Sequence, residues 1–501
     1  GGEELRSELY ANNNGIKFTT MQEKKHLYKI RNNAFDPNEF IKDFIDIRNE
    51  RLRKYKQYTT EKNAIDNREK PDSDLIKVWN KIHNSFFNLI VDQKVGYVFG
   101  NPISYQIEEE VSENEREWVK EYLYNQDVFL KDIETGTQQA ACGVSYRLLD
   151  IQTQLIPSVV ETVASLKNVN SWDAYVLGHK EAAIVLSEDY TEKGHTQILT
   201  LYTKDVIVEY HSAANEINEM TEFKIAGEIN NLLGIVPVFE FRNNQEMHSD
   251  FETVEDLNDA YDRMISSGAD EVEQFRLAYM LITGVDIEED EAKALFKKET
   301  GILNIRNPEG KAEFLTKMMP KDFFEYFVGM LEKNIFRFSK SVDVNDEAFA
   351  GGNESGEARK WKLIALEFKA NLTESWFEKG LRDMFEGIVA YMRIKLGMNS
   401  IVSSNIYADF TRTLPVDLGY LADTLTKLTT ILSERTVLGM IPAIDDVDAE
   451  MEQKQREREE KMNEMNSFGD FGQVNPNDAE QTGEVLDKEK ETDNKGSGQT
   501  R

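Results

Sequence analysis

The sequence predicts a helix-rich α+β protein with several domains, and three observations support this fold class. Apolar residues recur at helical spacing over residues 320–340 and again over residues 357–398. Between Gly143 and Phe241 the pattern changes to the alternation expected of strands. The chain has 501 residues, which is enough for two or more hydrophobic cores.

The composition is that of a globular protein in a reducing compartment. Hydrophobic residues make up 40% of the chain and charged residues 30%. The single cysteine, Cys142, excludes a disulfide framework and a cysteine-based metal site. A transmembrane helix needs an apolar run of about 18 residues or more, which the sequence lacks, and no charged-then-apolar leader opens the chain. We therefore expect neither a membrane protein nor a secreted one.

The formal net charge of −32 limits the kinds of partner. Proteins that bind nucleic acid tightly usually carry a basic surface, because they gain affinity by neutralising phosphates. Two hypotheses remain: DNA is not a partner, or DNA passes the protein without adhering to it. Net charge alone does not choose between them.

The secondary structure expected for the first half begins with helices and then turns to strands. A strong stop signal, Gly100-Asn101-Pro102, ends the second helix. The predicted helices span residues 39–56, 74–97 and 115–138, and the predicted strands span residues 103–107, 144–149, 174–177, 182–186, 196–203, 206–211 and 236–241.

The second half is predicted to be mainly helical. A helix over residues 357–398 would be about 60 Å long at about 1.5 Å per residue. The polar segment 466–501 has too few apolar residues to offset its ordering entropy, and we expect it to be disordered. The other predicted helices span residues 253–274, 288–298, 320–340, 418–439 and 447–465, and the predicted strands span residues 301–305 and 406–414.

The acidic, glycine-bearing segment 341–355 imitates two ligand-binding motifs and satisfies neither. Gly351 and Gly356 have the spacing of a phosphate-binding loop, but Glu357 stands where that loop needs lysine. The acidic residues imitate a calcium loop, but Ala348 stands where the sharp turn needs glycine. The six histidines lack zinc-ligand spacing, and the abundant carboxylates single out no acid–base pair. We expect no catalytic residue, no cofactor and no metal site.

Four groups of residues, in this order along the chain, resemble the portal proteins of tailed double-stranded DNA bacteriophages, in their siphovirus-type branch. The resemblance covers roughly residues 75–440. The third group is the glycine-bearing loop followed by the long helix. The first, second and fourth groups are Val91, Asp92, Lys94, Tyr97, Gly100 and Pro102, then Pro237, Phe241, Asn243 and Asn244, and finally Phe410, Thr411 and Arg412.

The resemblance implies a head-to-tail connector: a ring, typically of about twelve copies, at one vertex of the capsid. Double-stranded DNA would be packaged through its channel by the terminase motor and later ejected. The implied partners are other copies of the chain, the DNA, the terminase large subunit, the scaffolding and major capsid proteins, and a head-completion or adaptor protein, with no membrane. The implied location is the virion, with assembly in the host cytoplasm.

Domains named after those of portal proteins can be mapped onto the chain by the same resemblance. The expected parts are an N-terminal segment (1–19), a wing (20–252), stem helix 1 (253–274), a clip (275–319), stem helix 2 (320–340), a tunnel loop (341–355), a long tunnel helix (356–398), a wing strand (399–417), a crown (418–465) and a disordered tail (466–501).

The resemblance places the channel-lining loop at Asp343, Val344, Asn345, Asp346, Glu347, Phe349, Gly351, Gly352, Asn353 and Glu354. Lys333, Arg337 and Lys340, near the end of stem helix 2, either touch DNA phosphates transiently or form an ordinary solvated helix face. Two other functions stay open: a metal-dependent carboxylate nuclease, suggested only by acidic clusters, and an extended assembly adaptor that does not contact DNA.

Overall fold

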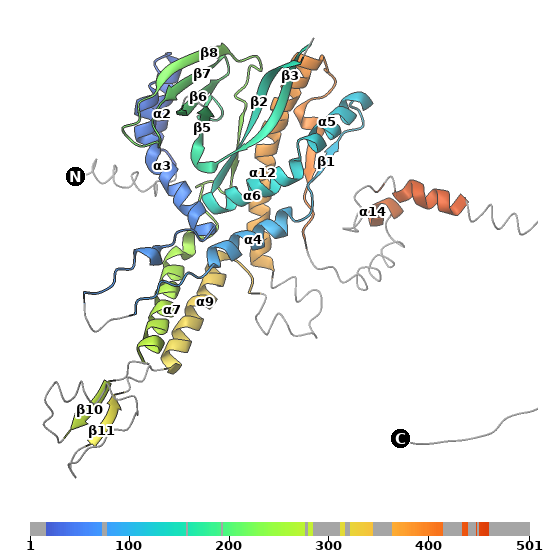
Figure 1. The fold of residues 1–501 in the computed structure, drawn as a ribbon. Helices are drawn as coiled ribbons and strands as arrows, with labels where there is room; N and C mark the ends of the chain where they lie inside the picture. The colour runs from blue at the N-terminus through green and yellow to red at the C-terminus, as the bar shows by residue number, and fades with distance from the viewer. Residues whose placement is uncertain are drawn as a thin grey trace, which may run out of the picture. The chain divides into compact units, whose positions relative to one another are not determined.

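The computed structural model describes residues 17–72, 78–156, 159–191, 194–275, 279–283, 311–315, 321–343, 363–413, 433–438, 447 and 450–459. The chain divides into two compact units, residues 1–415 and 416–501. The predictions for residues 284–310, 344–362, 414–432 and 460–501 lie outside the described residues. The described part is a mixed helix and sheet protein, as the sequence predicts (Figure 1).

In unit 1, two N-terminal helices pack against a five-stranded antiparallel sheet. Helices α2 (Thr20–Arg31) and α3 (Pro37–Tyr58) pack on one sheet face, where Phe40 and Phe44 meet Tyr175. The Asp36 side chain caps α3, whose first residue is a proline. In the order β4-β5-β6-β7-β8 the strands are Ala174–Leu177, Ala182–Thr191, Gly194–Thr203, Val206–Ser212 and Lys224–Asn230.

A second, three-stranded sheet has the order β3-β2-β9, with β2 at Val144–Ile156, β3 at Val159–Val169 and β9 at Val238–Arg242. Strand β2 runs beyond the predicted 144–149, and β3 and β8 were not predicted. Helices α5 (Glu113–Asn125) and α6 (Val128–Cys142) lie beside this sheet (Figure 1). The prediction of one helix over 115–138 was wrong, because Asp127 adopts φ 49° and Gln126 accepts a hydrogen bond from the Leu166 amide of β3.

The predicted helix 74–97 was also wrong over residues 78–85, while residues 74–77 lie outside the described part. Helix α4 spans Phe86–Phe99, and residues 78–84 have neither helix nor strand pairing. We call residues 78–84 the strap. Its alternate amides, those of Asn80, Ile82 and Asn84, donate to side chains of another helix and so cannot form intrahelical bonds.

That other helix is α7 (Glu255–Phe275), which pairs with α9 (Lys321–Ser339) (Figure 1). Both match the predicted helices 253–274 and 320–340 closely. Gly268 allows the close approach, because a Cβ there would lie 2.8 Å from the Phe324 ring. Between the two helices in sequence, β10 (Tyr279–Thr283) pairs with β11 (Lys311–Leu315).

Helix α12 (Ile364–Tyr391) packs one side into the core of unit 1 and continues as a π-helical turn, Met392–Leu396. Gly380 and Gly387 leave room for Phe241 and Phe239, whose rings would lie 2.4 and 2.5 Å from a Cβ. These two phenylalanines belong to β9, so the strand packs directly on the helix. The helix is confirmed from residue 364, and residues 357–362 lie outside the described part.

The remaining described elements are short. Strand β12 (Ile406–Asp409) pairs with β1 (Ser104–Ile107) and ends before the predicted 414, because Phe410 turns into the aromatic core. In the second unit, α14 (Glu434–Leu438) and residues 450–459 are helical. None of the helices described here is both long and apolar enough to span a membrane.

Candidate functional site

The structure describes the chain up to Asp343, at the start of the predicted channel loop, and again from Leu363. We call residues 339–343 the root of the loop. The Gln93 side chain of α4 holds this root with two hydrogen bonds. Its Nε2 donates to the Val342 carbonyl at 2.7 Å, and its Oε1 accepts from the Val342 amide at 2.7 Å. The side-chain amide therefore pairs with Val342 much as a neighbouring strand would.

A buried ionic cluster lies beside this root. Lys94 of α4 is fully buried, and its Nζ lies 2.8 Å from Asp250 Oδ2. The same Nζ donates to Asn243 Oδ1 at 2.6 Å and to Thr373 Oγ1 of α12 at 3.1 Å. A buried ammonium needs such partners, because desolvation alone would cost several kcal/mol (order of magnitude).

A second lysine connects this cluster to the end of α9. The Nζ of Lys369 on α12 lies 3.5 Å from Asp250 Oδ2 and donates to the Ser339 carbonyl at 3.0 Å. The bond to Ser339 satisfies one of the free carbonyls at the C-terminus of α9. We define the buried ionic cluster as Lys94, Asn243, Asp250, Lys369 and Thr373.

Burial and charge act against each other on the pKa values of the cluster. Burial lowers the pKa of Lys94, and the attraction of Asp250 offsets part of the shift. Burial, opposed by Asp250, lowers the pKa of Lys369 to about 8. Burial alone would raise the pKa of Asp250, but Lys369 and Lys94 outweigh it, so that pKa is lowered. Asp250 is therefore ionised at neutral pH, with two lysines around it.

A second polar cluster joins the first and fourth resemblance groups through α12. Arg412 pairs with Glu367 at 3.3 Å and with Glu374 at 2.6 Å. Tyr97 donates its hydroxyl hydrogen to Glu367 at 2.6 Å, and its ring lies under the Arg412 guanidinium. Burial and Glu367 both raise the pKa of Tyr97, so the phenol stays neutral.

Aromatic rings fill the space around these polar groups. Phe377 of α12 packs against Phe99, Phe241 and Phe410, with ring centroids 4.8, 4.8 and 6.0 Å away. Gly100 fits tightly under this layer, since a Cβ would lie 2.5 Å from Thr413 Oγ1. Residues from three separated parts of the sequence thus meet on one helix.

The other residues of the resemblance groups have local structural positions. Val91 is buried, and Asp92 accepts the Tyr58 hydroxyl hydrogen at 2.9 Å. The Pro237 carbonyl accepts from the Leu149 amide, and Asn244 accepts from the His248 amide. Pro102 precedes β1, and the carbonyl of Thr411 accepts from Asn101 at 3.3 Å.

Of the predicted channel-loop residues, only Asp343 lies within the described part. Val344, Asn345, Asp346, Glu347, Phe349, Gly351, Gly352, Asn353 and Glu354 lie outside it. The three predicted basic residues, Lys333, Arg337 and Lys340, are exposed on α9 and at its end. Their placement leaves both earlier interpretations, phosphate contact and solvated face, open.

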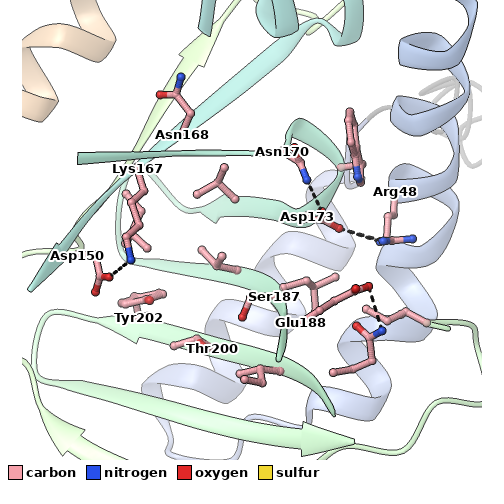
Figure 2. Close-up of a pocket in the computed structure, with 18 of the residues that line it drawn as sticks. Arg48, Asp150, Lys167, Asn168, Asn170, Asp173, Ser187, Glu188, Thr200 and Tyr202 are labelled. Atoms are coloured by element: carbon pink, nitrogen blue, oxygen red, sulfur yellow. Dashed lines mark hydrogen bonds and ion pairs between the residues drawn. The ribbon is translucent and has the colours of Figure 1, made fainter. Parts of the chain in front are cut away.

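A polar pocket of about 730 Å³ lies between the β2–β3 hairpin and the five-stranded sheet (Figure 2). Its two basic side chains pair with carboxylates: Arg48 binds Asp173 at 3.0 Å, and Lys167 binds Asp150. Glu188 accepts a hydrogen bond from the Gln197 amide at 3.1 Å. Because both basic side chains are already paired, the pocket does not favour an anionic ligand.

The part of the chain that the structure describes holds no group of three or more His, Cys, Asp or Glu residues able to hold a metal ion. Four of the six histidines each pair with a carboxylate, as His26 does with Asp43 at 3.0 Å and His83 with Asp66 at 2.8 Å.

A sequence model of the phage portal protein, SPP1 Gp6-like family matches residues 39–464. The chain belongs to this family. It is 24% identical over 398 residues to the portal protein of Bacillus phage SPP1, covering 75% of each chain. It is 23% identical over 416 residues to the portal protein of Clostridium phage phiCD119, covering 78% of this chain and 88% of that one.

Membership of the portal family confirms the predicted resemblance. Portal proteins are structural components of the phage capsid that serve DNA packaging and the head–tail connection, and they are not enzymes. The nuclease hypothesis is therefore set aside. Sequence analysis missed Asp250, Glu367 and Thr373 as functional neighbours, because each side chain acts on a residue far away in the sequence.

Proposed function

We propose that this portal protein assembles into a closed ring of about twelve copies, through whose channel double-stranded DNA is packaged and later ejected. Family membership over residues 39–464 is the observation that carries this proposal. In the proposed assignment, residues 20–252 and the strand 399–417 supply the wing, the α7–α9 pair supplies the stem, and residues 275–319 supply the clip. Residues 341–355 supply the channel loop, and residues 418–465 supply the crown.

The root of the channel loop supports this assignment by its construction. Gln93 holds Val342 at the start of the loop, Lys369 holds Ser339 just before it, and the buried ionic cluster ties α4, α9 and α12 together beside it. A loop that meets a moving duplex needs a rigid base, because force on the loop is transmitted to its attachment points. The net charge of −32 agrees with a channel to which DNA adheres weakly.

The proposal extends to partners. The terminase large subunit would dock during packaging, the scaffolding and major capsid proteins would surround the ring during assembly in the host cytoplasm, and a head-completion or adaptor protein would bind afterwards. The clip, which follows α7 and precedes α9, is the proposed docking part for terminase and adaptor. The adaptor hypothesis without DNA contact differs only in lacking an open channel.

Imaging of the purified full chain by electron microscopy, together with its native mass, tests the ring. Rings with a hole wider than a DNA duplex, about 20 Å, are expected. A globule without a channel at every salt concentration would overturn the proposal. Deletion of Asp346–Asn353 should leave rings intact and impair DNA packaging, and normal packaging by that variant would remove the loop from the proposal.

A further inference from the structure

The outer side of α12 carries an apolar stripe that the described part of the chain leaves uncovered. Ile364, Phe368 and Leu372 follow one another at four-residue spacing, and their side chains are 37%, 64% and 51% exposed. Leu366 and Ala370 point into the core from the opposite side of the helix. We call Ile364, Phe368 and Leu372 the α12 stripe.

Exposure of this kind on a helix that is otherwise central to a core marks an interaction surface. A DNA duplex is a poor neighbour for it, because a duplex presents charged phosphates and gains nothing from an apolar stripe. Protein interfaces, by contrast, are depleted of charge at their centres and enriched in aromatic residues. The α12 stripe contains no charged residue.

The α9 helix offers a second, unlike apolar surface at the same level of the molecule. Phe338, the next-to-last residue of α9, is 51% exposed. Its neighbour Ser339 receives the hydrogen bond from Lys369, which adjoins Phe368 on α12. Within one subunit, Phe338 and Phe368 therefore lie at similar heights along the α7–α9 pair.

In a ring whose axis runs along the α7–α9 pair, rotation to the next subunit preserves height along that axis. The surface that covers Phe368 must then lie near the level of the neighbour's Phe338. Two unlike surfaces meeting head to tail form the heterologous contact that a closed ring requires, whereas one self-complementary surface would stop at a dimer.

We propose that the α12 stripe of one subunit packs against the Phe338 end of α9 in the next copy of the chain. This inference rests on the proposed ring. The subunit interface beside the channel loop would then consist of apolar contacts. The basic residues of α9 would lie outside the centre of that interface.

Disulfide trapping in the full chain tests the pairing. Cys142 gives little background, because it is buried and burial raises the pKa of its thiol to about 12. Oxidised rings of the double variant Phe338→Cys/Phe368→Cys should give a ladder of covalent multimers, and each single variant should stay monomeric in denaturing gels. Dimers from either single variant would indicate a self-complementary contact and overturn the inference, as would a double variant that yields only monomers.

Charge insertion gives an independent measurement. Phe368→Lys should reduce the fraction of rings in native mass spectra at least tenfold, while circular dichroism remains that of the wild type. Met220→Lys is the matched control, because Met220 is 89% exposed in the loop between β7 and β8. Intact rings from Phe368→Lys would overturn the stripe as an interface and point to coverage by the chain's own segment 344–362. A wild-type chain that forms no rings would instead overturn the proposed function.

Discussion

The two helices of the α7–α9 pair are held by different means. Helix α7 is held along its length by the strap, whose alternate amides bond to Asp270, Ser266 and Asp262. Two residues of extended backbone advance about 6.6 Å and four residues of helix about 6.0 Å, so the two spacings match. Helix α9 is instead held at its C-terminal end, through Ser339 and the adjacent Val342.

This difference separates contacts that are complete within one subunit from a surface that remains exposed for assembly. The polar side chains that α7 presents to the strap are buried and satisfied within the chain. The outer side of α9 keeps Phe323, Tyr326 and Phe338 more than half exposed. Helix α7 therefore belongs to the folded monomer, whereas α9 packs on α7, is tied by hydrogen bonds at its C-terminal end, and has a face that the described part of the chain does not cover.

The largest expected loss of stability comes from a change in the buried ionic cluster at the C-terminal end of α9. Asp250→Ala would leave Lys94 and Lys369 buried without their carboxylate and should lower the free energy of unfolding by about 3–5 kcal/mol. Urea denaturation of the purified chain measures this change. Asp409→Ala, on exposed strand β12, is the control and should change stability by less than about 0.5 kcal/mol. An Asp250→Ala variant as stable as wild type would show that the cluster does not hold the junction.

The strap should yield a somewhat smaller loss. Asp270 accepts from both nitrogens of Asn80, at 2.6 and 2.9 Å, and pairs with Arg68 at 3.0 Å. Asp270→Ala should cost about 2–4 kcal/mol, since it leaves these donors unpaired. Hydrogen exchange should then quicken at the Asn80, Ile82 and Asn84 amides. Glu273→Ala, exposed on the same helix, should leave all three amides unchanged.

The bonds between the strap and α7 also predict that the stability of the chain depends on pH. Burial raises the pKa of Asp262 to about 6, above the roughly 3.9 of an unfolded chain. The folded state therefore holds this proton more tightly, and its contribution, present below about pH 4, is lost as pH rises through 6. The loss should be about 2–3 kcal/mol, from a difference of about two pKa units. It should be absent in Asp262→Asn and retained in the exposed control Asp256→Asn; equal pH profiles for wild type and Asp262→Asn would contradict the prediction.

The strap also shows why sequence patterns succeed for some elements and fail for others. Apolar periodicity located α7 and α9 within a few residues and placed α12 inside the predicted range 357–398, because their buried faces contact the rest of unit 1. The same criterion extended α4 backward over the strap, where Val78, Ile82 and Phe86 have helical spacing. The strap is not helical because its amides bond to Asp262 and Ser266 of α7, some 180 residues away in sequence.

The candidate site divides in a similar way. Family-like residues such as Lys94, Asn243 and Arg412 could be picked out from their order along the chain. Their partners Asp250, Thr373 and Glu367 could not, because a carboxylate in an acidic sequence carries no sign that it is buried. Only the fold reveals which of many acidic residues meets a buried lysine.

Gln93→Ala probes the grip on the loop root with a smaller effect. Loss of the two hydrogen bonds to Val342 should cost about 1 kcal/mol and speed hydrogen exchange at the Val342 amide. Gln93→Glu is the informative companion. Its carboxylate still accepts from the Val342 amide but faces the Val342 carbonyl without a donor, so protection of that amide should fall between those of wild type and Gln93→Ala. Unchanged protection in Gln93→Ala would mean that the clamp does not hold the root.

The smallest change in the free energy of unfolding should come from a basic residue of α9, compared with an exposed arginine of α7. Arg337 is exposed on a face that the described part of the chain leaves open, so Arg337→Gln should change the free energy of unfolding by less than about 0.5 kcal/mol. If this face meets DNA phosphates, packaging in the variant should become less sensitive to salt, because one phosphate contact fewer releases fewer counterions. Arg263→Gln, exposed on α7, is the matched control and should leave the salt dependence unchanged. Equal salt dependence in both variants would make the basic residues of α9 a solvated face, and a stability loss above about 1 kcal/mol would show that Arg337 serves the monomer after all.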